Sequence, residues 1–131
     1  MRHLRLRAGP HALLFPIAAT SSVDDGAAFV AKTIVRRDGF LVPVRDLAAE
    51  VGVAAHEPRV ALHLERGDER AILLVSAAES IVDVDDAAWR TIPASHDALA
   101  PWVDALCTLS DESPSFRLSV ALVWDRFAAS L

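Results

Sequence analysis

The chain has 131 residues, a hydrophobic content of 53% and a formal net charge of −5. This length is typical of one domain, and the apolar content disfavours a disordered chain. An acidic chain is a poor partner for nucleic acid, whose phosphates attract basic surfaces, so nucleic-acid binding is disfavoured. The apolar surplus favours an exposed apolar patch, which is a common feature of protein-binding surfaces.

The N-terminal segment predicts strands rather than a membrane anchor. Leu4 and Leu6 alternate with arginines, and a period of two is typical of a strand. The apolar run at 12–19 contains a proline and is shorter than the roughly 20 residues of a membrane helix. His11 to Ile17 is the next predicted strand. We therefore expect a cytoplasmic protein without direct membrane insertion.

The middle of the first half predicts a hairpin. Phe29 to Val35 is apolar enough for a strand, and Phe40 to Val42 returns after the turn Arg37-Asp38-Gly39. Asp-Gly supplies the positive φ angles that tight hairpin turns need. Pro43 lacks a backbone N–H and is expected to end the pairing. A short helix is predicted over 46–52, with an aspartate to cap its start and a glycine to close its end.

The next segments predict a hairpin of longer strands. Val60 to Glu65 alternates cleanly between apolar and other residues, and 66–68 is a turn that contains a glycine. Ala71 to Val75 is continuously apolar, which is typical of a central strand buried on both faces. Ser80 to Val84 is expected to continue that strand or to pair beside it.

The C-terminal part mixes several signals. Asp85 to Arg90 predicts one helical turn, whereas Pro101 to Leu109 fits both a helix and one face of a strand. Phe116 to Trp124 is the predicted final strand, and Arg126 to Leu131 is a candidate short terminal helix. No linker or low-complexity stretch divides the chain, so residues 1–131 are interpreted as one domain.

Several large or reactive residues are candidates for the core. The three tryptophans are Trp89, Trp102 and Trp124. Two of them are expected to be core residues, which leaves one to anchor a partner. Leu41 and Val42 are also expected in the core. Cys107 is the only cysteine, so it forms no internal disulfide and is interpreted as a small buried residue.

The motifs of common catalytic and metal sites are missing from the sequence. No two glycines are closer than 13 residues, so neither a phosphate loop nor a dinucleotide-binding loop is present. No two histidines share the i, i+4 spacing of a helical metal site, and one cysteine makes structural zinc improbable. His63 lies between two leucines and is expected to face solvent. The acidic run from Asp83 to Asp86 lacks the glycine and distal glutamate of a calcium loop and is interpreted as a solvated turn. We expect no metal, no cofactor and no enzymatic activity.

One segment resembles a family signature. Residues 34–47 are similar to the CheW-type motif, which is an apolar strand, an Arg-Gly turn, two or three apolar residues and then Pro-Val-x-Asp-Leu. The second half matches well, as Pro43-Val44-x-Asp46-Leu47. Further segments follow in the family's order over nearly the whole chain: Ile72–Val75, Ile81–Val84, Pro93, Ala100–Leu106 and Phe116–Phe127.

The resemblance implies a fold and a role. The fold is mostly β, with two small five-stranded SH3-like barrels that pack together and share a core, and one or two short helices. Members of the family are chemotaxis scaffolds without catalysis or cofactor. They couple the cytoplasmic tips of chemoreceptors to a CheA-type histidine kinase. A hydrophobic groove between the subdomains meets the receptor, and a separate barrel face meets the kinase.

The resemblance also implies a set of protein-binding residues. The predicted set is Arg36, Arg37, Gly39, Val42, Pro43, Asp46, Val82 and Asp83. The alternative is that the two arginines are exposed turn residues without a binding role. The turn is one residue longer than the family's, because of Asp38. A divergent member that keeps one interface, self-association, and a small-ligand-binding barrel or enzyme therefore stay open as alternatives.

Overall fold

The protein forms two five-stranded sheets, in a computed structural model that describes residues 1–92, 98–109 and 113–129. The first sheet has the order β8-β1-β2-β10-β9 and the second β3-β6-β7-β5-β4. The first consists of β1 (Arg2–Ala8), β2 (His11–Pro16), β8 (Ala77–Asp83), β9 (Val103–Thr108) and β10 (Pro114–Leu118). The second consists of β3 (Thr20–Asp25), β4 (Ile34–Arg37), β5 (Phe40–Asp46), β6 (Val60–Arg66) and β7 (Glu69–Val75).

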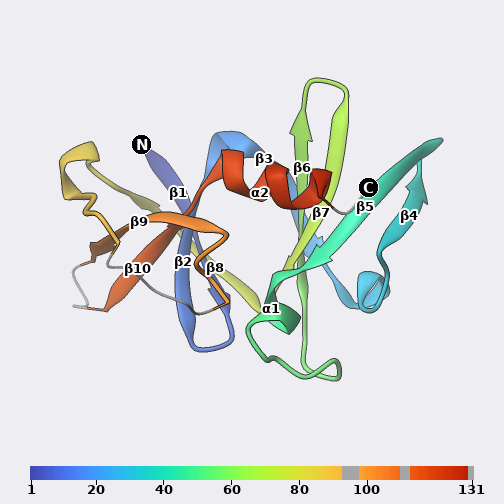
Figure 1. Ribbon diagram of the computed structural model, residues 1–131, viewed down its shortest axis with the longest axis horizontal. Helices are drawn as coiled ribbons and strands as arrows, with labels where there is room; N and C mark the ends of the chain where they lie inside the picture. The colour runs from blue at the N-terminus through green and yellow to red at the C-terminus, as the bar shows by residue number, and fades with distance from the viewer. Residues whose placement is uncertain (93–97, 110–112, 130–131) are drawn as a thin grey trace.

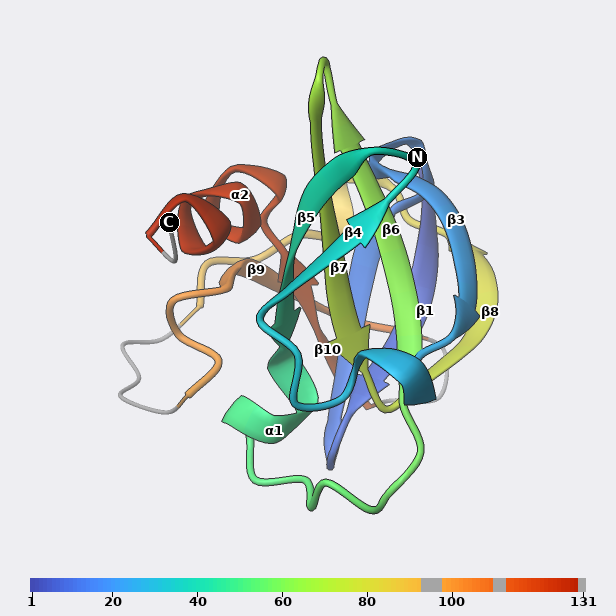
Figure 2. The same cartoon turned by 90° about the vertical axis from the view of Figure 1, so that its right-hand side faces the viewer.

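Short helical segments connect and cover the sheets. The α-helices are α1 (Leu47–Glu50) and α2 (Val120–Ala128), and the 3-10 turns are η1 (Ile17–Ala19), η2 (Ala27–Phe29) and η3 (Asp86–Ala88). Figure 1 shows the first sheet on the left, the second on the right and α2 between them, and Figure 2 shows the second sheet from its outer side. No helix in the described part of the chain is long and apolar enough to cross a membrane.

The predicted fold class is confirmed, with one difference in detail. The molecule is mostly β, and its strands divide into two sets of five. Among the described residues, however, the two edge strands of each sheet do not pair with each other. Each set is therefore an open sheet rather than the closed barrel that the resemblance implied.

The hairpin of β6 and β7 forms as predicted. Val60 pairs with Val75 and Arg66 with Glu69, and Gly67 supplies a φ of +60° in the turn between them. β7 is the central strand of its sheet and is buried on both faces. Its odd-numbered apolar residues face the main core, and its even-numbered ones pack into a smaller cluster with β5.

The strand predicted over 29–35 is mostly wrong. Phe29 ends the 3-10 turn η2, and only Ile34 and Val35 lie in β4. The chain turns because the Asp25 carboxylate accepts a hydrogen bond from the N–H of residue 27, while Gly26 bonds to a distant backbone carbonyl. These local hydrogen bonds compete with strand pairing.

Residues 80–84 do not pair beside β7. Residues 80–83 belong to β8, which pairs with β1 in the first sheet. Ser76 directs this crossing, because its N–H donates to the carbonyl of Arg7 at 2.7 Å and its hydroxyl accepts from the N–H of Gly9 at 3.0 Å. The predicted neighbour was therefore wrong, although the strand itself exists.

The predicted final strand over 116–124 is two elements. β10 ends at Leu118, and α2 begins at Val120 after Ser119, whose hydroxyl accepts from the N–H of Leu122 at 3.2 Å. A capping serine of this kind starts a helix. The residues that α2 buries are Val123, Trp124 and Phe127, a spacing that fits a helix better than a strand. The terminal helix thus starts earlier than residue 126, and residues 130–131 lie outside the described part.

The ambiguous segment at 101–109 contains a strand and no helix. β9 buries alternate residues, namely Val103, Ala105 and Cys107. Burial raises the pKa of the Cys107 thiol, which agrees with its interpretation as a core residue. The helical turn predicted over 85–90 is present as η3. Pro93 and part of the turn before β10 lie outside the described residues.

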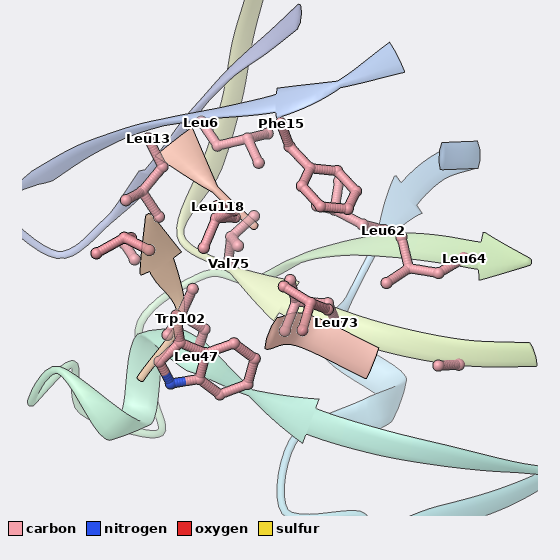
Figure 3. Close-up of a cluster of buried hydrophobic side chains, with 14 of the residues drawn as sticks. Leu6, Leu13, Phe15, Leu47, Leu62, Leu64, Leu73, Val75, Trp102 and Leu118 are labelled. Atoms are coloured by element: carbon pink, nitrogen blue, oxygen red, sulfur yellow. The ribbon is translucent and has the colours of Figure 1, made fainter. Parts of the chain in front are cut away.

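One main core joins both sheets and α2. Figure 3 shows Leu6 and Phe15 from the first sheet beside Leu62 and Leu73 from the second, with Trp102 next to them. Trp102 and Trp124 are buried and Trp89 is half-buried, so the expectation of two core tryptophans is confirmed. The expectation for Leu41 is wrong, since its side chain is 62% exposed, whereas that of Val42 is 3% exposed.

His3 is a buried histidine beside Trp89. His3 is 1% exposed, and its ring packs at 5.3 Å from Trp89. Burial lowers the pKa of His3, while the carbonyl of Met1 opposes that change in pKa and nearby positive charge adds to it. The folded protein therefore favours the neutral ring, and the unfolded chain binds the proton more readily.

Lowering the pH should destabilise the fold through His3. Because the folded pKa lies below the ordinary value of about 6.5, stability is complete above that value and falls as the pH drops through it. Urea unfolding between pH 7.5 and 5 measures this slope. His3→Gln should show a smaller slope, and His56→Gln, at an exposed loop position, is the control. Equal slopes in His3→Gln and the unmodified protein would contradict this assignment.

Candidate protein-binding surface

The β4–β5 hairpin has the tight turn that the sequence predicts. Arg37 pairs with Phe40, and the two turn residues Asp38 and Gly39 have φ angles of +50° and +81°. Positive φ at both central residues matches the twist of a two-residue hairpin. The hairpin lies at the far end of the molecule from β9 and β10 (Figure 1). Gly39 therefore shapes an exposed projection.

The two faces of this hairpin differ. Val35 and Val42 lie opposite each other and pack into the smaller core cluster. The other face, here called the outer hairpin face, consists of Ile34, Arg36, Leu41 and Pro43. Ile34 is 46% exposed there and Leu41 62%. Large apolar side chains are thus exposed to solvent on one face, which is a common feature of protein-binding surfaces.

Pro43 does not end its strand. Pairing with β4 stops at the pair of Ile34 and Pro43, as predicted, but β5 continues to Asp46. From Val44 onward β5 pairs with β7 instead. The missing N–H of the proline therefore lies at the position where β5 changes its neighbour, which is a place where a strand tolerates proline.

Three arginines at the hairpin have no carboxylate partner within the described residues. Arg36 and Arg37 are exposed on β4, and the Arg37 guanidinium lies 5.6 Å from the centre of the Phe29 ring. Arg70 from β7 lies 4.6 Å from the ring of Phe40. Seven other arginines do form ion pairs: Arg5, Arg7, Arg45, Arg59, Arg66, Arg117 and Arg126. The hairpin is therefore a positive region on an acidic protein.

Sequence reasoning missed the contributions of Phe40 and Arg70. Phe40 is 47% exposed, although it was assigned only to the returning strand. Its partner in the ring contact comes from a strand 30 residues further along. A short-range pattern cannot reveal that pairing, because it depends on β5 and β7 being neighbours in the sheet.

A small pocket lies on the inner side of this region. Its volume is about 180 Å³, and Arg37, Arg70 and His63 are among its lining residues. The His63 ring is half-buried, with Nε2 at 3.1 Å from a carboxylate oxygen of Asp24. The prediction that His63 faces solvent is thus only partly right. The described residues include no hydroxyl hydrogen-bonded to that ring and no metal-ligand cluster.

Asp46 has a structural position. One of its carboxylate oxygens accepts from the N–H of Ala49 at 3.0 Å and caps α1, as predicted. Both oxygens also accept from Nε of Arg59 at 3.0 Å. The rest of that guanidinium donates to three backbone carbonyls in the connection between α1 and β6: Val53, Ala54 and Glu57. Arg59 is 3% exposed, so the pair holds this connection against the second sheet.

Val82 and Asp83 lie apart from the hairpin residues. They belong to β8, an edge strand of the first sheet, whereas the hairpin is at the edge of the second. Val82 is half-buried and packs near Leu14. Asp83 is exposed and forms an ion pair with the N-terminal ammonium at 3.2 Å. The predicted binding residues thus form two separate regions rather than one surface.

Comparison with solved structures identifies a similar fold. The chain is similar to the scaffolding protein TtCheW from Thermoanaerobacter tengcongensis, with a TM-score of 0.72 and 15% sequence identity. The similarity covers 90% of this chain and 83% of that chain. No protein-family model matches the sequence, and no curated protein matches it either. This protein therefore has a CheW-like fold, at a sequence identity that identifies the fold alone.

Proposed function

We propose that this protein is a non-catalytic adaptor of a bacterial chemosensory system, which couples the cytoplasmic tips of chemoreceptors to a CheA-type histidine kinase. The observation that carries the proposal is the CheW-like fold across 90% of the chain. The neighbour with that fold is described as a scaffolding protein. A cytoplasmic location follows from this role.

The hairpin is the proposed first interface. Arginine and aromatic residues are enriched among the residues that dominate binding energy at protein interfaces. Arg36, Arg37 and Arg70 supply cations without a carboxylate partner in the described chain, and Phe40 and Leu41 supply exposed apolar area. Gly39, Val42, Pro43 and Asp46 act through the shape of the hairpin and its anchoring.

The edge of the first sheet is the proposed second interface. Val82 and Asp83 lie there, on a strand with the exposed apolar residue Ile81. Two separated regions suit an adaptor that contacts two proteins. A member that retains only one interface, or one that associates with itself, is the alternative within the same class.

A small-ligand-binding protein is an alternative from another class, and the pocket beside His63 gives it little support. Ligand sites for small molecules usually have volumes of roughly 300–1,000 Å³ and a mostly apolar lining. The pocket beside His63 has a volume of about 180 Å³ and is lined largely by charged and polar side chains. Its size and lining therefore favour a surface feature over a dedicated ligand site.

Charge reversal at Arg37 should weaken partner binding at least tenfold, because loss of a hot-spot arginine typically costs about 2 kcal/mol or more and about 1.4 kcal/mol corresponds to tenfold. The measurement is co-sedimentation of the Arg37→Glu protein with receptor-tip fragments and, separately, with the kinase. Arg90→Glu is the control, since Arg90 is exposed and has no carboxylate partner in the described chain. Wild-type binding of Arg37→Glu to both partners would remove the hairpin from the proposal.

Separate binding measurements with receptor and kinase distinguish the adaptor from the single-interface alternative. An adaptor binds receptor and kinase, whereas a single-interface protein binds only one of them. If the protein retains just one partner, the hairpin variant should affect that partner alone. Binding to neither would overturn the proposed function.

A further inference from the structure

A large groove lies within the second-sheet half of the molecule. Its volume is about 740 Å³, and it runs between the segment before β4, the end of β5 and α1. The apolar residues of its lining are Val30, Ala31, Ile34, Pro43, Val44, Ala49 and Ala55. It is thus distinct from the polar pocket beside His63 and from the junction of the two sheets.

The groove exists because β5 loses its neighbour on one side. β4 covers β5 only up to Pro43, and one further hydrogen bond joins the N–H of Val44 to the carbonyl of Thr33 at 2.9 Å. Beyond that point, the chain before β4 and the helix α1 form the two walls. Ile34 and Pro43 belong both to this groove and to the outer hairpin face, so the groove and the exposed apolar side chains are continuous.

The charges around the groove favour an acidic occupant. Its carboxylates already have partners, because Asp46 pairs with Arg59 and Glu50 with Arg45. Lys32 lines the groove, is exposed and has no carboxylate partner in the part of the chain that the structure describes. Arg36, on the adjoining outer hairpin face, is also exposed and has no carboxylate partner among the described residues. The cations at this rim therefore remain available to a partner's carboxylate.

We infer that this groove docks a protein segment that carries a large apolar side chain next to a carboxylate. The apolar side chain enters between Ile34, Pro43 and Ala49, and the carboxylate meets Lys32. The volume of the groove is sufficient for a large side chain and its neighbours. The inference rests on the proposed function, because the segment is taken to belong to the kinase or to the receptor tip.

Lys32 offers a direct test, because it is the only lysine of the chain. A carbodiimide joins an amine to a carboxylate as an amide, with the lost water taken up by the reagent. With purified kinase or receptor-tip fragment, mass spectrometry should find Lys32 joined to an aspartate or glutamate of the partner. Lys32→Arg should bind as the unmodified protein does and yield no such product, because the guanidinium does not react.

Substitutions in the groove provide the second readout. Ile34→Asp should raise the dissociation constant for the partner at least tenfold. Ala49→Leu should raise it by a similar factor, because the larger side chain fills the groove. Val23→Asp is the matched control, because Val23 is 40% exposed on β3, the opposite edge strand of the same sheet, and Ile34 is 46% exposed. Urea unfolding of each variant confirms that it is folded.

The possible outcomes separate this inference from the proposed function. Binding that survives Ile34→Asp and Ala49→Leu, with no product at Lys32, overturns the groove and leaves the adaptor role intact. A cross-linked pair of copies without any partner overturns it in favour of self-association. Failure to bind either partner overturns both. Cross-linking at Lys32 together with selective weakening by Ile34→Asp supports it.

Discussion

Replacing Arg59 with methionine is expected to lower the free energy of unfolding by about 3–5 kcal/mol, because removal of one partner strands a buried charge. The Arg59 side chain is 0% exposed and that of Asp46 17%. In the variant, the Asp46 carboxylate would keep only its hydrogen bond to the start of α1. Three carbonyls in the connection would also lose their donor. Urea unfolding measures the loss.

Asp46→Asn separates the two roles of the aspartate. Asparagine caps a helix about as well as aspartate does, so the variant keeps the cap and loses the charge. A double-mutant cycle with Arg59→Met then gives the coupling energy of the pair. We expect strong coupling, with the double variant more stable than the sum of the single changes predicts. Additive effects would contradict the ion pair as the source of the stability.

Replacing Trp102 with alanine is expected to destabilise the fold by about 3–5 kcal/mol, the range for large aromatic residues in cores. Trp102 is fully buried and lies in the core cluster that joins both sheets. Its indole N–H has no hydrogen-bond partner in the described chain. Trp102→Phe should therefore lose less, because it keeps a ring in the core and removes that unpaired group.

The same variant tests the proposal that residues 1–131 form one domain. Because Trp102 contacts a core shared by the two sheets, its loss should shift one cooperative unfolding transition rather than split it. Circular dichroism and tryptophan fluorescence should report the same midpoint. Two separated transitions, with only one affected by Trp102→Ala, would show two independent folding units.

The sequence predicted those features that depend on neighbouring residues. The turn at Asp38 and Gly39 and the capped helix after Asp46 follow from local backbone chemistry, and both formed as expected. The buried strand at 71–75 was also visible, because continuous apolar runs are typical of central strands. The resemblance to the CheW-type motif also indicated the fold; its proline lies where β5 changes its neighbour, and its aspartate caps α1.

The features that the sequence did not reveal depend on distant contacts. β8 pairs with β1 rather than beside β7, and that choice is made by Ser76 through hydrogen bonds to the first hairpin. Arg59 was not among the predicted residues, because its carboxylate partner is 13 residues away. The cationic group around Arg70 likewise appears only when β5 and β7 become neighbours. The predicted site residues on β4, β5 and β8 therefore stay predictions, and the contribution of Arg70 across the sheet was not among them.

The most direct test of the adaptor role is whether this protein joins the two proposed partners. Kinase is mixed with vesicles that display receptor tips, with and without the chain, and the kinase in the pellet is measured after sedimentation. We predict that the amount of kinase in the pellet rises with the concentration of the chain and that Arg37→Glu reduces it. A pellet that contains the same amount of kinase with and without the chain would contradict the proposed function.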